Sequence, residues 1–190
     1  MKNNSSRRGA GRPGAKEGPS GAGDSAAARP DRETTKMKLL DFISAKAVLP
    51  AMKATDRDSA LVELVEALRD AGLAGPSQVK PLVDALTKRE QLGSTGIGKG
   101  IAVPHAKHAS VKQVIGAVGR SATGIEFNAL DGAPVYLLFL IISPPDAGSD
   151  HLRALERVSA LIRNDDFNRF LRTAPDAQGM VDVLKEVDES

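Results

Sequence analysis

A glycine-rich segment that ends in a histidine holds the residues best suited to chemistry. It runs from Glu90 to Ala106 and reads EQLGSTGIGKGIAVPHA, with glycines at positions 93, 96, 98 and 100. Glycine adopts positive φ readily, so several backbone N–H groups of such a loop can converge on one anion. His105 follows the loop, and an imidazole can act as a nucleophile near neutral pH. The pattern predicts a phosphate-sized anion site beside a reactive histidine.

The apolar run before this histidine predicts a strand. Ile101, Val103 and His105 alternate with Ala102 and Pro104, which places the first three on one face with His105 at the exit of the strand. A neutral imidazole can take a phosphoryl group on one nitrogen if an acceptor holds the other nitrogen as N–H. The identity of that acceptor stays open at this point.

Two further side chains are candidates for the same site. Arg89 lies at the end of a predicted helix just before the loop, where its guanidinium can reach phosphate oxygens in a bidentate manner. His151 lies in the first turn of another predicted helix, where the helix dipole disfavours imidazolium. A neutral His151 could therefore donate a hydrogen bond to a phosphoryl oxygen on His105. The predicted phosphate-binding positions of the loop are Ser94, Thr95, Gly96, Gly98 and Gly100, for which turn formation is the ordinary alternative.

The loop is not expected to bind a nucleotide. Residues 93–99 fit the first part of a P-loop motif, but Gly100 stands where a Ser or Thr would ligate magnesium. A P-loop also follows a strand and opens a helix, whereas here a predicted helix precedes the loop and a strand follows it.

The rest of the chain predicts a layered α/β unit that positions these residues. Val135–Ile142 is a continuous apolar run and predicts a central strand covered on both faces, which Pro144 and Pro145 end. A helix that Ser149 or Asp150 caps should then turn Leu152, Leu155, Val158, Leu161 and Ile162 inward. The other predicted elements are an entry turn at 39–43, strands at 48–52 and 111–119, and helices at 56–72, 76–90, 165–171 and 176–187.

Composition divides the chain into a tail and a domain. Residues 1–36 contain no Leu, Ile, Val or aromatic side chain and hold eight Lys or Arg against four Asp or Glu, which predicts a disordered basic tail. Residues 37–190 hold 18 basic and 20 acidic residues, so the domain itself is not expected to bind nucleic acid. The chain has no cysteine, and its longest apolar run is too short to span a membrane, which fits a cytoplasmic protein.

The glycine-rich motif resembles the active-site signature of the type-2 IIA domains of the bacterial phosphoenolpyruvate-dependent phosphotransferase system. The shared pattern is Glu90, six residues, Ile97-Gly98, two residues and then Ile101–Ala106. The longer run from Arg89 to Gly98 is similar to the nitrogen-regulatory branch of these domains. The resemblance in element order extends over about 37–187.

This resemblance implies an α/β sandwich with a mixed central sheet flanked by helices. It implies that His105 accepts a phosphoryl group from an HPr-like carrier protein and passes it to a IIB-type acceptor, in sugar uptake or in the regulation of a target protein. His151 matches the family's second active-site histidine, and Arg89 matches its active-site arginine. The resemblance implies neither a metal nor a cofactor.

Two other hypotheses stay open. A binding module with the same fold could signal without transferring phosphate, because phosphate on His105 would change the charge of a docking surface. A zinc site could use His105, His108 and His151, completed by a carboxylate such as Glu90 because the chain has no cysteine.

Overall fold

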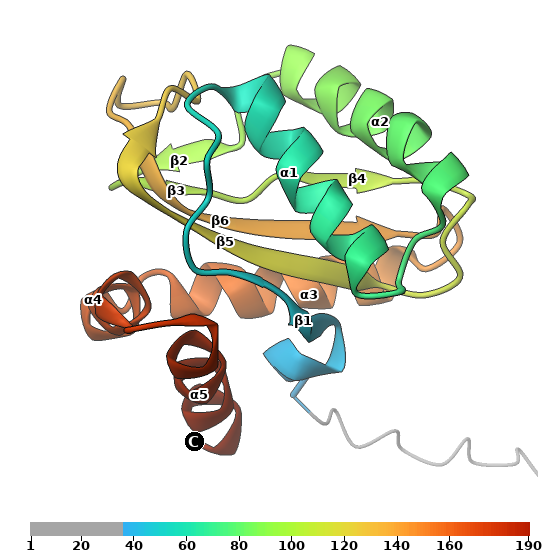
Figure 1. Cartoon of the computed structure of the whole chain (residues 1–190). Coiled ribbons are helices and arrows are strands. Elements are labelled where there is room, and N and C mark those ends of the chain that lie inside the picture. Colours follow the sequence, from blue (N-terminus) through green and yellow to red (C-terminus); the bar gives the residue numbers. More distant parts are fainter. Residues whose placement is uncertain (1–35) are drawn as a thin grey trace, which may run out of the picture. The chain divides into compact units, whose positions relative to one another are not determined.

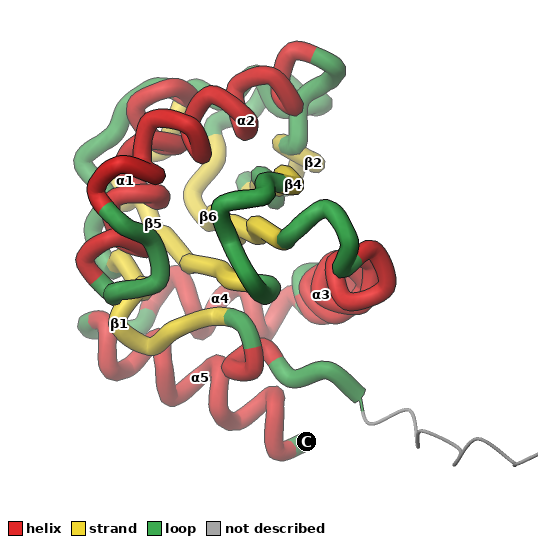
Figure 2. Tube along the Cα trace, turned by 90° about the vertical axis from the view of Figure 1, so that its right-hand side faces the viewer, coloured by secondary structure: helices red, strands yellow, loops and turns green. Residues whose placement is uncertain are grey.

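The computed structural model describes residues 36–190, and Figure 1 shows how their helices and strands are arranged. The prediction of a disordered basic tail over 1–36 lies, except for Lys36, outside the described residues. A sheet lies between two layers of helices, as the two views show (Figure 1; Figure 2). One layer contains α1 (Arg57–Asp70) and α2 (Val79–Gln91), and the other contains α3 (Gly148–Leu161), α4 (Asp165–Thr173) and α5 (Ala177–Glu189). The predicted layered α/β sandwich is confirmed.

The described residues form a six-stranded mixed sheet with the order β1-β5-β6-β3-β2, and β4 also pairs with β6. Strand β6 is antiparallel to β5 but parallel to β3 and β4, while β1 is parallel to β5. The two pieces β3 and β4 therefore hold the glycine-rich segment against the middle of the sheet. The strands are β1 (Ile43–Leu49), β2 (Gly96–Gly98), β3 (Ile101–Ala102), β4 (His105–Lys107), β5 (Ile115–Ile125) and β6 (Val135–Ser143).

Strand β6 is buried on both faces because its side chains alternate between two cores. The even-numbered residues from Leu138 to Ile142 belong to the core under α1 and α2. The odd-numbered residues from Leu137 to Ile141 belong to the core under α3, α4 and α5. Each fully buried Leu, Ile or Phe contributes roughly 1.5–3 kcal/mol relative to exposure, so this strand anchors both layers. The prediction of a central strand covered on both faces is confirmed.

Side-chain caps define where several helices begin. The Asp56 carboxylate accepts the Ser59 N–H at 2.9 Å at the start of α1, and Gly72 follows the helix with a φ of +76°. Asn164 caps α4 and Asp176 caps α5 in the same manner. Within residues 36–190, no helix combines the length and the apolar character needed to cross a bilayer.

Several predicted boundaries differ from the structure. The first strand is Ile43–Leu49 instead of 48–52, and β5 runs to Ile125 instead of ending at 119. Gly124, with a φ of +88°, lies where the register between β5 and β6 shifts, so this glycine marks an irregularity inside the strand and not its end.

The start of α3 also differs from the prediction. The helix begins at Gly148 without a side-chain cap, and Leu152, which was predicted to face inward, is 59% exposed. Ala154 and Val158 take the fully inward positions.

Candidate functional site

His105 begins a strand in the structure instead of ending one. Strand β3 ends at Ala102, Val103 and Pro104 interrupt the ladder, and β4 starts at His105. Both pieces pair with β6, where His105 lies opposite Ile141. Ile101 and Val103 pack in the core under α3, and the His105 ring faces His151 of α3 with the ring centroids 5.7 Å apart. The predicted shared face is confirmed, and it turns the imidazole towards α3.

A backbone carbonyl fixes the tautomer of His105. Its Nδ1 lies 2.8 Å from the carbonyl oxygen of Val103. A carbonyl oxygen can only accept a hydrogen bond, so Nδ1 carries the proton and Nε2 of the neutral ring keeps its lone pair. The Val103 carbonyl is thus the acceptor that the sequence left unidentified.

The surroundings keep the half-buried ring of His105 neutral. Burial lowers its pKa, and the positive charge of Arg89 acts in the same direction. The hydrogen bond to Val103 and the negative charge of Glu90 oppose this shift but do not reverse it.

His151 faces His105 from the first turn of α3. Its side chain is buried, and the centroids of the two rings lie 5.7 Å apart with the planes inclined by 55°. Its Nδ1 lies 2.7 Å from the buried hydroxyl of Ser143, the last residue of β6. Burial lowers the pKa of His151 to about 4, with smaller contributions from His105 and Lys107. The second ring is therefore neutral at physiological pH.

Arg89 lies near the end of α2, on the side from which the loop leaves. It donates a hydrogen bond from Nη1 to the carbonyl oxygen of Gly93 at 2.9 Å. A guanidinium has five N–H donors, so this contact leaves capacity for an anion. The His105 ring faces His151, and Arg89 lies close enough to His105 for its positive charge to lower the pKa of the ring.

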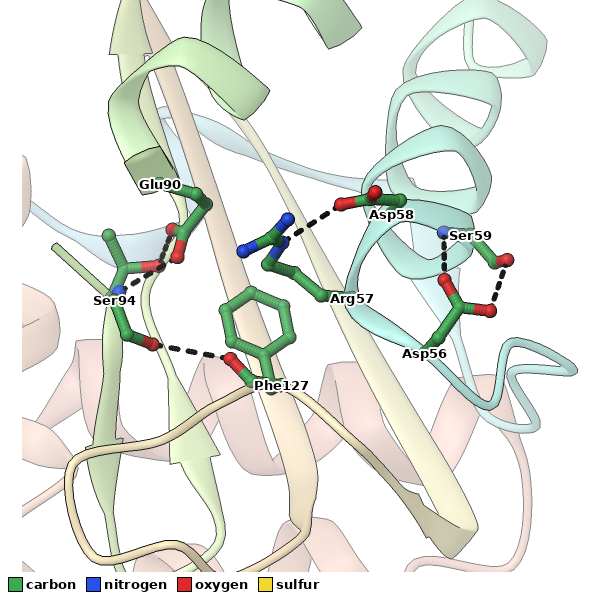
Figure 3. A network of polar contacts seen from close by, with 8 residues as sticks. Asp56, Arg57, Asp58, Ser59, Glu90, Ser94 and Phe127 are labelled. Carbon is green, nitrogen blue, oxygen red and sulfur yellow. Dashed lines mark hydrogen bonds and ion pairs between the residues drawn. The ribbon is translucent and has the colours of Figure 1, made fainter. Parts of the chain in front are cut away.

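The loop residues that were predicted to bind phosphate use several of their donors within the protein. The Thr95 N–H donates to Glu90, and the Gly96 N–H donates to the Ser94 hydroxyl at 3.0 Å. The Ser94 hydroxyl itself donates to the carbonyl oxygen of Phe127 at 3.3 Å, as Figure 3 shows. These groups serve first to fold the loop.

Gly98 and Gly100 lie at the turn between β2 and β3, with φ values of +95° and +75°. This turn lies beyond Ile101, which pairs with Leu137, whereas His105 pairs with Ile141. Four residues along a strand span about 13 Å. The structure therefore does not bring Gly98 and Gly100 to His105, and phosphate binding by the loop residues stays a prediction. The positive φ values of Gly98 and Gly100 explain these glycines by the turn alone.

Sequence reasoning missed the structural role of Glu90. Its side chain is only 4% exposed, and its carboxylate accepts hydrogen bonds from the Thr95 N–H at 3.0 Å and from the Thr95 hydroxyl. Figure 3 shows Glu90 reaching from the end of α2 to the chain beside Ser94. A glutamate in the last turn of an amphipathic helix is usually exposed to solvent. The position of Glu90 at the start of the motif was therefore the one feature of the sequence that could have indicated its structural role.

The residues named in the zinc hypothesis do not form a cluster of metal ligands in the described part of the chain. His108 Nδ1 lies 2.7 Å from the hydroxyl of Ser110. Among the residues that the structure describes, no group of three or more His, Cys, Asp or Glu side chains is arranged to hold a metal ion.

Comparisons with known proteins agree with this geometry. Residues 41–187 match the family model "Phosphoenolpyruvate-dependent sugar phosphotransferase system, EIIA 2". The chain is 38% identical over 148 residues to a nitrogen regulatory protein of Bradyrhizobium diazoefficiens, covering 78% of this chain and 95% of the relative.

Two solved structures share the fold. The nitrogen regulatory protein IIA-Ntr of Neisseria meningitidis superposes with a TM-score of 0.68 at 30% identity, over 76% of this chain and 97% of that one. Enzyme IIA of mannitol from Escherichia coli, solved in complex with phosphorylated enzyme IIB, has a TM-score of 0.61 at 18% identity, over 75% of this chain and 96% of that one.

Proposed function

Because the chain belongs to the type-2 EIIA family of the phosphoenolpyruvate-dependent sugar phosphotransferase system, we propose that His105 is the residue that carries the phosphoryl group. The donor in this proposal is a phosphohistidine of an HPr-like carrier protein. The acceptor is a IIB-type protein, or the phosphorylated state itself regulates a target protein. The proposal rests above all on the hydrogen bond from His105 Nδ1 to the Val103 carbonyl, which leaves Nε2 as the available nucleophile.

The proposed step exchanges one N–P bond for another. The lone pair of His105 Nε2 attacks phosphorus, the N–P bond of the donor breaks, and the donor imidazole leaves with that electron pair. The proton on His105 Nδ1 stays in its bond to the Val103 carbonyl throughout. Such a transfer needs positioning and charge stabilisation more than covalent assistance.

Two side chains are proposed to stabilise the phosphoryl oxygens. If the Ser143 hydroxyl donates to His151 Nδ1, the proton of neutral His151 lies on Nε2, from which it can donate to a phosphoryl oxygen on His105. The guanidinium of Arg89, whose charge acts on His105, supplies positive charge for the phosphoryl oxygens. Neither group has to change its protonation state.

The nitrogen regulatory relatives support a regulatory role. This chain spans 95% and 97% of the length of two nitrogen regulatory proteins, at 38% and 30% identity. The mannitol complex supports a IIB-type partner for the fold. We therefore propose a cytoplasmic phosphocarrier of the nitrogen-regulatory type, in which phosphate on His105 changes the contact with a partner.

Phosphorylation in vitro tests the proposal. Incubation with enzyme I, HPr and labelled phosphoenolpyruvate should give an acid-labile, base-stable adduct that His105→Ala abolishes. His108→Ala is the matched control, because it removes a nearby histidine outside the proposed site, and it should keep the label. A label that survives in His105→Ala would exclude the assignment, and a labelled chain that passes phosphate to no IIB protein would favour the purely regulatory module.

A further inference from the structure

We propose that Glu90 is a positioning residue for His105 and acts on it through a continuous chain of hydrogen bonds that includes Thr95 and Val103. The consequence for phosphoryl transfer rests on the proposed function of His105. The effect on the His105 ring itself does not.

The chain contains three hydrogen bonds in series. The Glu90 carboxylate accepts the Thr95 N–H at 3.0 Å, and the carbonyl oxygen of Thr95 accepts the Val103 N–H at 3.0 Å. The carbonyl oxygen of Val103 then accepts the proton on His105 Nδ1 at 2.8 Å. The backbones of two residues, Thr95 and Val103, thus link the carboxylate to the imidazole. The N–H and the carbonyl of one residue belong to different peptide groups, so the chain of contacts fixes the position of the Val103 carbonyl against His105 Nδ1, while the charge of Glu90 acts on the ring through space.

The environment of Glu90 strengthens this effect. The carboxylate is nearly inaccessible to water, so its charge is screened much less than that of a surface glutamate. It also accepts the hydroxyl proton of Thr95, which fixes the orientation of the carboxylate. The held Val103 carbonyl keeps the proton on His105 Nδ1, and the negative charge of Glu90 raises the basicity of the ring, so both favour attack on phosphorus by the lone pair of Nε2.

The charged and titratable groups around His105 act in opposite directions. Arg89 and Glu90 approach from α2, His151 faces the ring from α3, and Lys107 lies on β4 itself. Arg89 favours the neutral ring, whereas Glu90 favours the protonated ring. Of these four groups, Glu90 bears the negative charge that hydrogen bonds connect to the imidazole.

A second glutamate provides a matched comparison. Glu63 of α1 also accepts two backbone N–H groups, from Lys53 at 3.0 Å and from Ala54 at 2.9 Å. It therefore fastens a loop to a helix by the same chemistry as Glu90, but its bonds lead to the segment after β1. If Glu90 were only a structural clamp, its replacement and that of Glu63 would have the same kind of effect.

Titration of the His105 ring, followed by NMR in the full chain, tests the proposal. Glu90→Gln keeps the size of the side chain, one acceptor for the Thr95 N–H and one partner for the Thr95 hydroxyl, but removes the charge. We expect Glu90→Gln to lower the pKa of His105 further and to weaken the preference for the Nδ1–H tautomer in the ring ¹⁵N shifts. Glu63→Gln should leave both measurements at their wild-type values.

Phosphorylation rates provide an independent measurement. Loss of a group that orients a functional histidine through hydrogen bonds commonly costs about tenfold or more in activity. Glu90→Gln should therefore accept phosphate about tenfold more slowly than wild type, whereas Glu63→Gln should keep the wild-type rate. If the wild-type chain accepts no phosphate at all, the proposed function fails, and the titration still decides the role of Glu90.

Unchanged titration and ¹⁵N shifts in Glu90→Gln would overturn the proposal, as would an equal change in Glu63→Gln. If Glu90→Gln does not fold, Glu90→Asp replaces it. The side chain shortened by one methylene cannot hold the Thr95 N–H at 3.0 Å in the same backbone, so the same weakening of the tautomer preference is expected. Wild-type ¹⁵N shifts in Glu90→Asp would then overturn the proposal.

Discussion

The imidazole rings of His105 and His151 lie with their centroids 5.7 Å apart, although one ring comes from the start of β4 and the other from the first turn of α3. Two imidazoles at this separation disfavour double protonation, because each positive charge raises the cost of the other. The Val103 carbonyl orients one ring, and the Ser143 hydroxyl lies against Nδ1 of the other. The pair therefore consists of two neutral rings, and a separate partner holds the Nδ1 atom of each ring.

The lowered pKa of His151 predicts a loss of stability in mild acid. In the unfolded chain this group has a pKa near 6.5, whereas in the fold its pKa is about 4. Between these pH values the unfolded state binds more protons than the native state, so stability falls as the pH drops from about 6.5 towards 4. Above this window the group contributes no pH dependence. The loss should be on the order of 2–3 kcal/mol in urea unfolding.

His151→Gln isolates this contribution, because it removes the titrating ring but keeps a polar group near Ser143. Its unfolding free energy should depend less on pH between 6.5 and 4.5 than that of wild type. An unchanged slope in His151→Gln would mean that the acid sensitivity arises elsewhere.

Replacement of Ser143 should separate positioning from stability. Ser143→Ala leaves His151 Nδ1 without its hydroxyl partner inside the core, which should cost about 1–3 kcal/mol. The freed ring can change its tautomer, so phosphate acceptance should fall about tenfold.

Ser121→Ala is the control for this variant. Ser121 is also buried in the sheet, and its hydroxyl accepts the Gly124 N–H at 3.1 Å, within β5. It should lose stability to a similar extent and keep the wild-type rate of phosphorylation. Equal rates in Ser143→Ala and wild type would remove Ser143 from the site.

The sequence predicted the elements whose signals are local. Asp56 and Gly72 mark the ends of α1 because capping chemistry acts within one helical turn. The apolar run of β6 predicted its burial on both faces, since a strand covered on both faces has no polar positions. The alternation around His105 predicted its face correctly.

The parts that could not be predicted depend on residues far apart in the chain. Ser143 meets His151 only because β6 ends beside the start of α3. Gly96 was interpreted as part of an anion site, yet a Cβ there would lie 2.8 Å from Ala129, so close packing of two backbones explains this glycine. Composition alone does not distinguish a glycine that opens space for a ligand from one that admits a neighbouring loop.

This distinction makes Gly96→Ala informative. The added methyl group would collide with Ala129 and displace the loop next to Thr95, so stability should fall by about 1–3 kcal/mol and phosphorylation should slow together with it. Gly132→Ala is the control, since Gly132 has a φ of +69° and open space around its Cβ position. It should lose about 1 kcal/mol and keep the wild-type rate. A Gly96→Ala chain with full stability but slow phosphorylation would instead favour the phosphate-binding interpretation.

The buried ion pair between Arg157 and Asp188 predicts the largest loss of stability. The two side chains are 5% and 4% exposed and lie 3.0 Å apart, and the Asp188 carboxylate also accepts the N–H groups of Leu39 and Leu40 at 2.7 and 2.9 Å. Asp188→Ala would leave the guanidinium buried without a counter-charge, which should cost about 3–5 kcal/mol in urea unfolding.

The exposed pair between Lys185 and Asp182 of the same helix supplies the control for Asp188→Ala. Its atoms lie 3.6 Å apart with both side chains at least half exposed, so Asp182→Ala should change stability by less than about 1 kcal/mol. Because Asp188 joins α5 to the start of the described chain and to α3, its loss should also expose the amides of Leu39 and Leu40 to hydrogen exchange. A small loss in Asp188→Ala, similar to that in Asp182→Ala, would show that water or a rearranged side chain replaces the carboxylate.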